Sequence, residues 1–93
     1  MENVLYLTDL YDYYSNLFTE KQKSYFEDYY FDNLTMEEIA ENNNVSKNAI
    51  SKTLIEVKEK LIEYESALHL YEKRKKIESL LDDEIVNIIS EYI

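Results

Sequence analysis

A short segment near the middle of the chain concentrates side chains that can bind phosphates and the edges of nucleic-acid bases. Four of them stand at spacings that one side of a helix would gather: Lys47, Asn48, Ser51 and Lys52. Lysine meets phosphate as a point charge, whereas asparagine and serine hydrogen-bond to base edges and phosphate oxygens. The segment holds no arginine for a bidentate contact with guanine. These residues therefore predict a nucleic-acid contact face with few cationic groups.

Further basic residues follow this segment along the chain. Lys58 and Lys60 come next, and an unbroken basic run occupies residues 73–76 as Lys73, Arg74, Lys75 and Lys76. Two interpretations of the run stay open, a phosphate-contacting patch and the solvated face of a helix. We include Lys58 and the whole run among the candidate nucleic-acid-binding residues.

The distribution of charge favours this face more than the net charge does. The formal net charge of −10 argues by itself against a nucleic-acid partner. Residues 1–45 carry −8, residues 46–76 carry +3, with eight basic residues against five acids, and residues 77–93 carry −5. Because charges more than about 8 Å apart are largely screened at physiological salt, the basic segment can still present a locally positive surface.

Residue types that support catalysis are sparse in this chain. His69 is the only histidine, and there is neither cysteine nor glycine. The lack of glycine excludes a glycine-rich phosphate loop and a nucleophile elbow, and the lack of cysteine excludes disulfides and thiolate metal sites. Adjacent carboxylates such as Glu37 and Glu38 diverge on a helix. The sequence predicts a non-enzymatic protein without a cofactor or a bound metal.

The candidate face lies within a pattern typical of a helix-turn-helix motif over residues 35–54. Thr35 and Glu38 form a capping box that starts one helix, and the asparagines at 42–44 can end it because asparagine tolerates left-handed backbone. Ser46 is an N-cap that starts the next helix. Small Ala40 lets the two helices cross closely, as the motif requires.

The second helix of the motif is predicted to be unusually long, over residues 46–76. An apolar seam runs along it at steps of four and three residues, through Ile50, Leu54, Val57, Leu61, Tyr64, Leu68 and Tyr71. A seam of this length measures roughly 30 Å, more than a three-helix domain covers. The residues of its second half, Leu61, Tyr64, Leu68 and Tyr71, are therefore predicted to form a homodimer interface. The alternative is that the first and last helices fold back and cover them within one chain.

The whole chain is predicted to be a single all-α domain over residues 1–93. It has no glycine or proline for tight hairpins, and every segment shows helical spacing. Supporting helices are expected over residues 3–33, and a helical tail over residues 77–93 with a break near 80–83. No apolar run approaches the roughly 20 residues of a membrane span, and the N-terminus lacks the basic region of a signal peptide, so we expect a cytoplasmic protein.

Several segments together resemble one protein family. They are TEKQ at 19–22, YFEDYYFD at 25–32, LTMEEIAE at 34–41, VSKNAI at 45–50 and YESALHLYEK at 64–73. They resemble the YlxM family, small bacterial proteins whose motif is similar to the C-terminal DNA-reading domain of sigma factors. The resemblance implies a sigma-factor-like helical fold and an accessory role in the signal recognition particle pathway. Asn43 departs from the pattern, because such motifs usually place an apolar residue there to seal the turn.

Three hypotheses about function follow from the motif and the resemblance. The favoured one is a non-enzymatic regulatory protein that contacts the RNA of the signal recognition particle through its helix-turn-helix face. A DNA-binding transcriptional regulator is the first alternative. The second is a protein-interaction module whose acidic helices bind the particle's GTPase.

Overall fold

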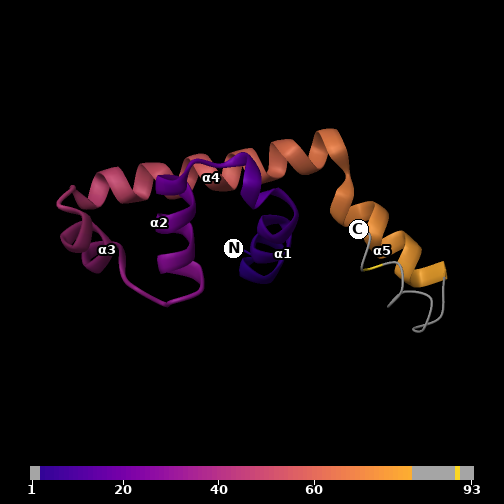
Figure 1. Cartoon of the computed structure of the whole chain (residues 1–93), viewed down its shortest axis with the longest axis horizontal. Helices are drawn as coiled ribbons and strands as arrows, with labels where there is room; N and C mark the ends of the chain where they lie inside the picture. The colour runs from indigo at the N-terminus through magenta and orange to yellow at the C-terminus, as the bar shows by residue number, and fades with distance from the viewer. Residues whose placement is uncertain (1–2, 81–89, 91–93) are drawn as a thin grey trace.

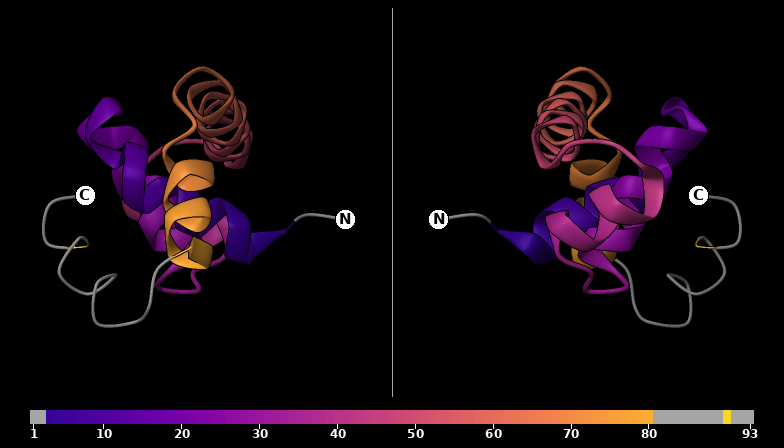
Figure 2. Two further views of the ribbon diagram at one scale, coloured as in Figure 1. Left: turned by 90° about the vertical axis from the view of Figure 1, so that its right-hand side faces the viewer. Right: turned by 90° about the vertical axis from the view of Figure 1, so that its left-hand side faces the viewer.

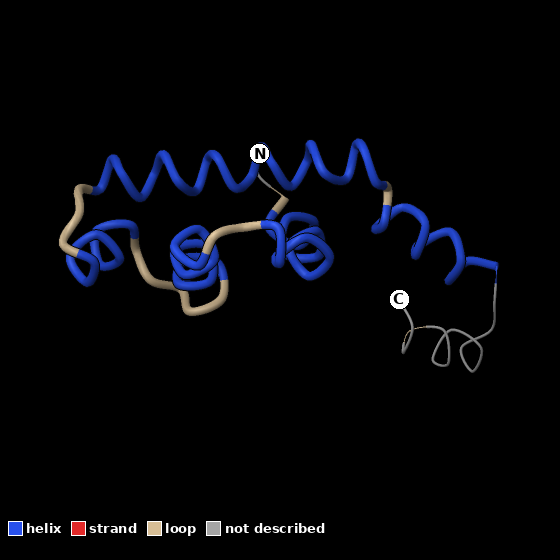
Figure 3. Tube along the Cα trace, turned by 45° about the horizontal axis from the view of Figure 1, so that its top comes forward, coloured by secondary structure: helices blue, strands red, loops and turns tan. Residues whose placement is uncertain are grey.

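The computed structural model describes residues 3–80 and residue 90, and within these residues it contains helices and no strands. The elements are α1 (Val4–Tyr14), the 3-10 helix η1 (Ser15–Leu17), α2 (Glu20–Tyr30), α3 (Met36–Asn43), α4 (Lys47–Leu68) and α5 (Leu70–Leu80). Short loops join the helices (Figure 3). The all-α prediction is confirmed.

The long helix α4 organises the molecule. It forms a rod along which α1, α2 and α3 all lie on one side, and α5 bends away from its far end toward that same side (Figure 1). Seen along the long axis, α5 descends from the end of α4 (Figure 2). The opposite side of α4 therefore carries no other described helix.

The core fills the space between α4 and the three helices packed on it. Its buried members are Leu7, Leu10, Tyr11, Tyr14, Phe18, Tyr25, Phe26, Ile39, Ala40, Ile50, Leu54, Val57 and Leu61. Aromatic rings join the helices, since the ring of Tyr11 stacks on that of Phe26 with 4.4 Å between centroids. Large aromatic side chains thus supply the buried area of a short chain.

The helix-turn-helix motif forms as its capping residues predict. The Thr35 hydroxyl accepts a hydrogen bond from the Glu38 N–H at 3.1 Å, and the Glu38 carboxylate accepts one from the Thr35 N–H at 3.0 Å. The Ser46 hydroxyl accepts the Ala49 N–H at 3.1 Å and starts α4. Asn44 ends α3 in the left-handed conformation, with φ 55°. Asn43 donates its side-chain amide to the Ile39 carbonyl at 2.7 Å, which gives this polar residue a partner in the turn.

The prediction of one continuous helix over residues 46–76 is wrong. α4 ends at Leu68, His69 adopts left-handed backbone with φ 57°, and α5 begins at Leu70. The cause is Glu65, a carboxylate that is only 7% exposed. Its oxygens accept the N–H groups of Tyr71 at 3.0 Å and of Glu72 at 3.1 Å. These first N–H groups of α5 therefore bond to a side chain instead of to carbonyls of a continuing helix.

Tyr14 of α1 completes this junction between α4 and α5. Its hydroxyl donates to the Glu65 carboxylate at 2.6 Å and accepts the Leu70 N–H at 3.1 Å. The first three N–H groups of α5 are thus all satisfied by side chains of α4 and α1. The bend is a tertiary feature, because residues 14 and 65 are 51 positions apart.

The apolar seam of the long helix is covered largely within this one chain. Leu61 is fully buried, and the ring of Tyr64 lies against those of Tyr14 and Phe18. The ring of Tyr71 meets that of Tyr6 edge-on, with 5.2 Å between centroids. Of the four predicted dimer-interface residues only Leu68 is exposed, at 45%. The apolar seam by itself therefore no longer predicts a homodimer.

The predicted C-terminal tail lies mostly outside the described residues. Residues 77–80 form the last turn of α5, and the break expected near 80–83 and nearly all of the remaining tail are not described. Among the described helices, none is both long enough and apolar enough to cross a membrane.

Candidate nucleic-acid interface

The first two turns of α4 present the predicted contact residues beside the helix-turn-helix turn. Ile50 and Leu54 are fully buried against the core and fix which side of the helix faces outward. Asn48 and Lys52 are exposed on that outward side, and Ser51 is half-buried at its edge. The motif therefore holds a small polar surface on a rigid helix.

Lys47 lies at the start of α4 but already has a partner. Its Nζ is 2.9 Å from a carboxylate oxygen of Glu37 on α3, and both side chains are largely exposed. The hydrogen bond to Lys47 lowers the pKa of the Glu37 carboxyl, and the same bond raises the pKa of the Lys47 amine. A phosphate at Lys47 must compete with this carboxylate. Lys52, by contrast, forms no ion pair within residues 3–80.

Beyond these two turns the outward side of α4 becomes acidic and apolar. Glu56, Glu59 and Glu63 follow Lys52 at helical spacing and are exposed. Ile55 and Ile62 lie beside them, 48% and 55% exposed. Because carboxylates repel phosphates, the candidate contact face extends no further than the second turn of α4.

Lys58 and Lys60 do not extend this face together. Residues two positions apart in a helix point about 200° away from each other. Lys58 is half-buried and Lys60 is exposed. At most one of them can lie on the side that carries Lys52.

The basic run on α5 divides into two pairs. Arg74 donates from Nε to Glu78 at 2.9 Å, a bond that raises the pKa of its guanidinium. Lys75 lies over the Tyr71 ring, with Nζ 5.6 Å from the centroid. Lys73 and Lys76 are exposed and form no ion pair with a described residue. Only this second pair is available for an anion.

The structure does not bring the candidate residues into one surface. α4 is about 33 Å long, so the motif and the basic run on α5 lie toward opposite ends of the molecule (Figure 1). Acidic residues of α4 occupy the outward side between them. We therefore treat Asn48, Ser51 and Lys52 as one candidate face and Lys73 and Lys76 as another.

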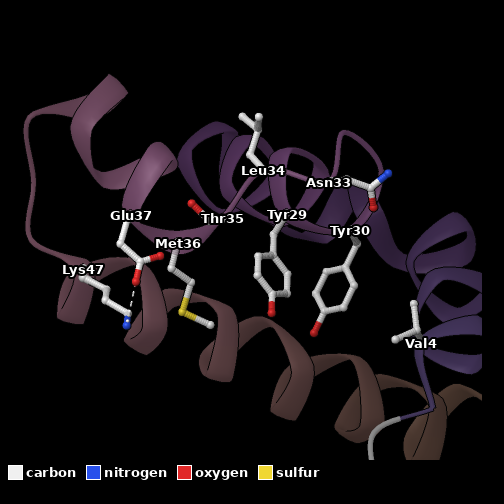
Figure 4. Close-up of a pocket in the computed structure, with 9 residues that line it drawn as sticks. All are labelled: Val4, Tyr29, Tyr30, Asn33, Leu34, Thr35, Met36, Glu37 and Lys47. Atoms are coloured by element: carbon white, nitrogen blue, oxygen red, sulfur yellow. Dashed lines mark ion pairs between the residues drawn. The ribbon is translucent and has the colours of Figure 1, made fainter.

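A groove beside the motif is lined by residues that were not among the predicted site residues. It has a volume of about 520 Å³ and lies between α2, α3 and α4. Tyr29, Tyr30 and Met36 point toward α4, and the Lys47–Glu37 ion pair closes one end (Figure 4). Tyr29 and Tyr30 follow Tyr25 and Phe26 on α2 at the spacing of an apolar helix face, so no sequence signal distinguished a groove wall from the interior.

Comparisons with known proteins agree with the motif. The model of the UPF0122 family, described as a helix-turn-helix protein that is YlxM / p13 like, matches residues 1–91. A UPF0122 protein of Ureaplasma urealyticum serovar 10 is 52% identical over 71 residues, covering 76% of this chain and 72% of the relative. Relatives of the same name in Fusobacterium nucleatum and Clostridium acetobutylicum are 37% and 41% identical over 83 residues. These two alignments each cover 89% of this chain, and 81% and 72% of the respective relatives.

Proposed function

Because this chain belongs to the UPF0122 family of YlxM / p13-like helix-turn-helix proteins, we propose that it is a non-enzymatic accessory of the signal recognition particle that binds the particle's RNA. In this proposal the first two turns of α4 contact RNA phosphates. The observation that carries it is the exposed pair Asn48 and Lys52 on the second helix of the motif, with Lys52 unpaired within residues 3–80. Such a protein would act in the cytoplasm.

The face suits phosphates and unpaired bases better than the interior of an RNA duplex. The major groove of A-form RNA is too deep and narrow for side chains to read, so RNA is recognised mainly through its backbone and its loops. Lys52 offers one cation, and Asn48 and Ser51 offer hydrogen bonds. The acidic turns that follow limit the contact to a few phosphates, so we expect a shallow dependence of affinity on salt.

A fluorescence-anisotropy titration tests this function. The protein is titrated into labelled signal recognition particle RNA and into a random DNA duplex, at low and at physiological salt. Lys52→Ala should weaken RNA binding and reduce the slope of log affinity against log salt by about 0.7 to 0.9, the value of one phosphate contact. Lys60→Ala is the matched control, because Lys60 is also exposed and unpaired among the described residues but lies elsewhere around α4. Absence of binding to either nucleic acid at low salt would contradict the proposal.

A second function, binding to the particle's GTPase without nucleic acid, is favoured by one specific feature. The outward side of α4 carries exposed Ile55 and Ile62 among Glu59 and Glu63, a surface suited to an apolar partner with basic groups. Binding to the GTPase that depends on Ile62 and is unaffected by Lys52→Ala would favour this function over RNA binding.

The DNA-regulator alternative depends on the homodimer. Paired recognition helices must lie about 34 Å apart to enter successive major grooves. With Leu61, Tyr64 and Tyr71 covered inside the chain, Leu68 and the exposed isoleucines of α4 would have to form the dimer contact. Sedimentation of the parent beside Ile62→Glu tests the dimer, and preference for a palindromic duplex tests the regulator.

A further inference from the structure

The junction of α4 and α5 brings together three side chains of the kinds that bind zinc. Glu65 and His69 lie at the end of α4, and Glu72 lies in the first turn of α5. One ligand atom from each lies within 4.8 Å of the others, and His69 Nδ1 is 2.9 Å from a Glu72 oxygen. We propose that Glu65, His69 and Glu72 bind one divalent ion of the zinc class, which joins α4 to α5.

Glu65 is a pre-oriented ligand with a free coordination direction. One of its oxygens accepts both the Tyr14 hydroxyl and the Tyr71 N–H, and the other accepts only the Glu72 N–H. An ionised carboxylate offers about four acceptor positions on its two oxygens. One position on the second oxygen therefore remains for an ion. Hydrogen bonds that fix a metal-binding carboxylate in this way are a regular feature of metal sites.

His69 provides the ligand that distinguishes zinc from the harder cations. Its left-handed backbone is fixed, because its N–H donates to the Glu65 carbonyl at 2.8 Å and its own carbonyl accepts the Lys73 N–H at 2.8 Å. The other left-handed residues of the described chain are asparagines, Asn33 and Asn44, so the backbone alone does not require an imidazole here. Imidazole nitrogen favours zinc, nickel and copper, whereas magnesium prefers oxygen ligands.

The separation of the three side chains fits a tetrahedral site after a small adjustment. Zinc binds nitrogen at about 2.0 to 2.1 Å and carboxylate oxygen at about 2.0 to 2.2 Å, so neighbouring ligand atoms lie about 3.4 Å apart. His69 and Glu72 are 49% and 71% exposed, and their side chains can turn to reach this spacing. Water takes the fourth position.

The charges around the three side chains determine the zinc affinity that we expect. The carboxylates of Glu65 and Glu72 match the charge of a divalent ion. Lys73 and Lys76 line a hollow with His69 and Glu72, and Lys75 lines the hollow that contains Glu65. These ammonium groups oppose a cation, although their exposure leaves them screened by salt. We therefore expect moderate affinity, lost when one ligand is removed.

Bound zinc would hold the first turn of α5 against the last turn of α4. The direction of α5, and with it the exposed Lys73 and Lys76, would then be fixed relative to the motif. No metal site was predicted from the sequence, although the steps of four and three residues from Glu65 to His69 to Glu72 would place all three side chains on one side of a helix. That spacing was a signal that could have found the cluster.

Isothermal titration calorimetry of the purified chain with Zn²⁺, and visible absorption with Co²⁺, test the site. The expected result is one ion per chain. His69→Asn, which keeps a residue suited to left-handed backbone, and Glu72→Gln should each lower zinc affinity at least tenfold. Tyr14→Phe removes a hydrogen bond to Glu65 and should cost about 10- to 100-fold. Far-ultraviolet circular dichroism establishes that each variant is folded.

Glu63→Gln is the matched control, since it removes an exposed carboxylate of α4 that lies outside the cluster. It should leave zinc affinity within twofold of the parent. Three results would overturn the proposal: no zinc binding by the parent, unchanged zinc binding by folded His69→Asn, or Mg²⁺ binding as tight as Zn²⁺ binding.

Discussion

Replacement of Glu65 by alanine is the sharpest test of how this fold is held together. The substitution leaves the Tyr14 hydroxyl and the N–H groups of Tyr71 and Glu72 without their acceptor. A buried donor left unsatisfied costs about 1–3 kcal/mol. The N–H groups of Tyr71 and Glu72 can recover part of this free energy by donating hydrogen bonds to water when α5 loosens. We therefore expect a loss of about 2–3 kcal/mol, a large share of the roughly 5–15 kcal/mol that stabilises a typical domain.

Urea unfolding followed by circular dichroism at 222 nm measures this loss, and amide hydrogen exchange locates it. Exchange should quicken first at Tyr71 and Glu72, because their N–H groups lose the Glu65 carboxylate. Glu63→Ala is the control, since Glu63 lies on the same helix and is exposed. If the two variants have free energies of unfolding within about 0.5 kcal/mol of each other, the surface-substitution range, the account of the bend is wrong.

The remaining predictions concern alkaline stability, the turn of the motif and the core. Burial of Tyr14, and secondly its hydrogen bond to Glu65, raises the pKa of the Tyr14 hydroxyl from 10.0 to about 12. The contribution of Tyr14 to the free energy of unfolding is therefore complete below pH 10.0 and is lost as the pH rises toward 12. Circular dichroism against pH should show that Tyr14→Phe loses less stability at alkaline pH than the parent does. Asn44 has φ 55°, so Asn44→Ala should cost about 1–2 kcal/mol while Asn44→Gly is nearly neutral in urea unfolding. Leu61→Ala should cost about 2–5 kcal/mol in the same assay because Leu61 is fully buried, and a cost below 1 kcal/mol would contradict its place in the core.

The sequence by itself determined the helix-turn-helix motif and the helical class. The capping bonds of Thr35 and Ser46 join residues three positions apart, so the residues that form them are read directly from the chain. The inward position of Ile50 followed from helical spacing in the same way. An interaction could therefore be predicted from the sequence wherever both of its partners lie within one helical turn.

The candidate face was predicted in part. The exposure of Asn48 and Lys52 follows from the periodicity of α4, and the structure agrees with it. Periodicity did not reveal that Glu37 pairs with Lys47 or that Arg74 pairs with Glu78. The available cations are therefore fewer, and more widely separated, than the count of basic residues suggested.

Only the tertiary structure decided where the long helix ends. No residue between 60 and 76 breaks a helix by its type, and the apolar seam continues through Tyr71. The break arises because Glu65 is buried beside Tyr14, which lies 51 positions away, and its carboxylate replaces the carbonyls of a continuing helix as the acceptor for the first N–H groups of α5. A hydrogen bond between residues so far apart leaves no trace in local spacing, so the bend and the covered seam became visible only in three dimensions.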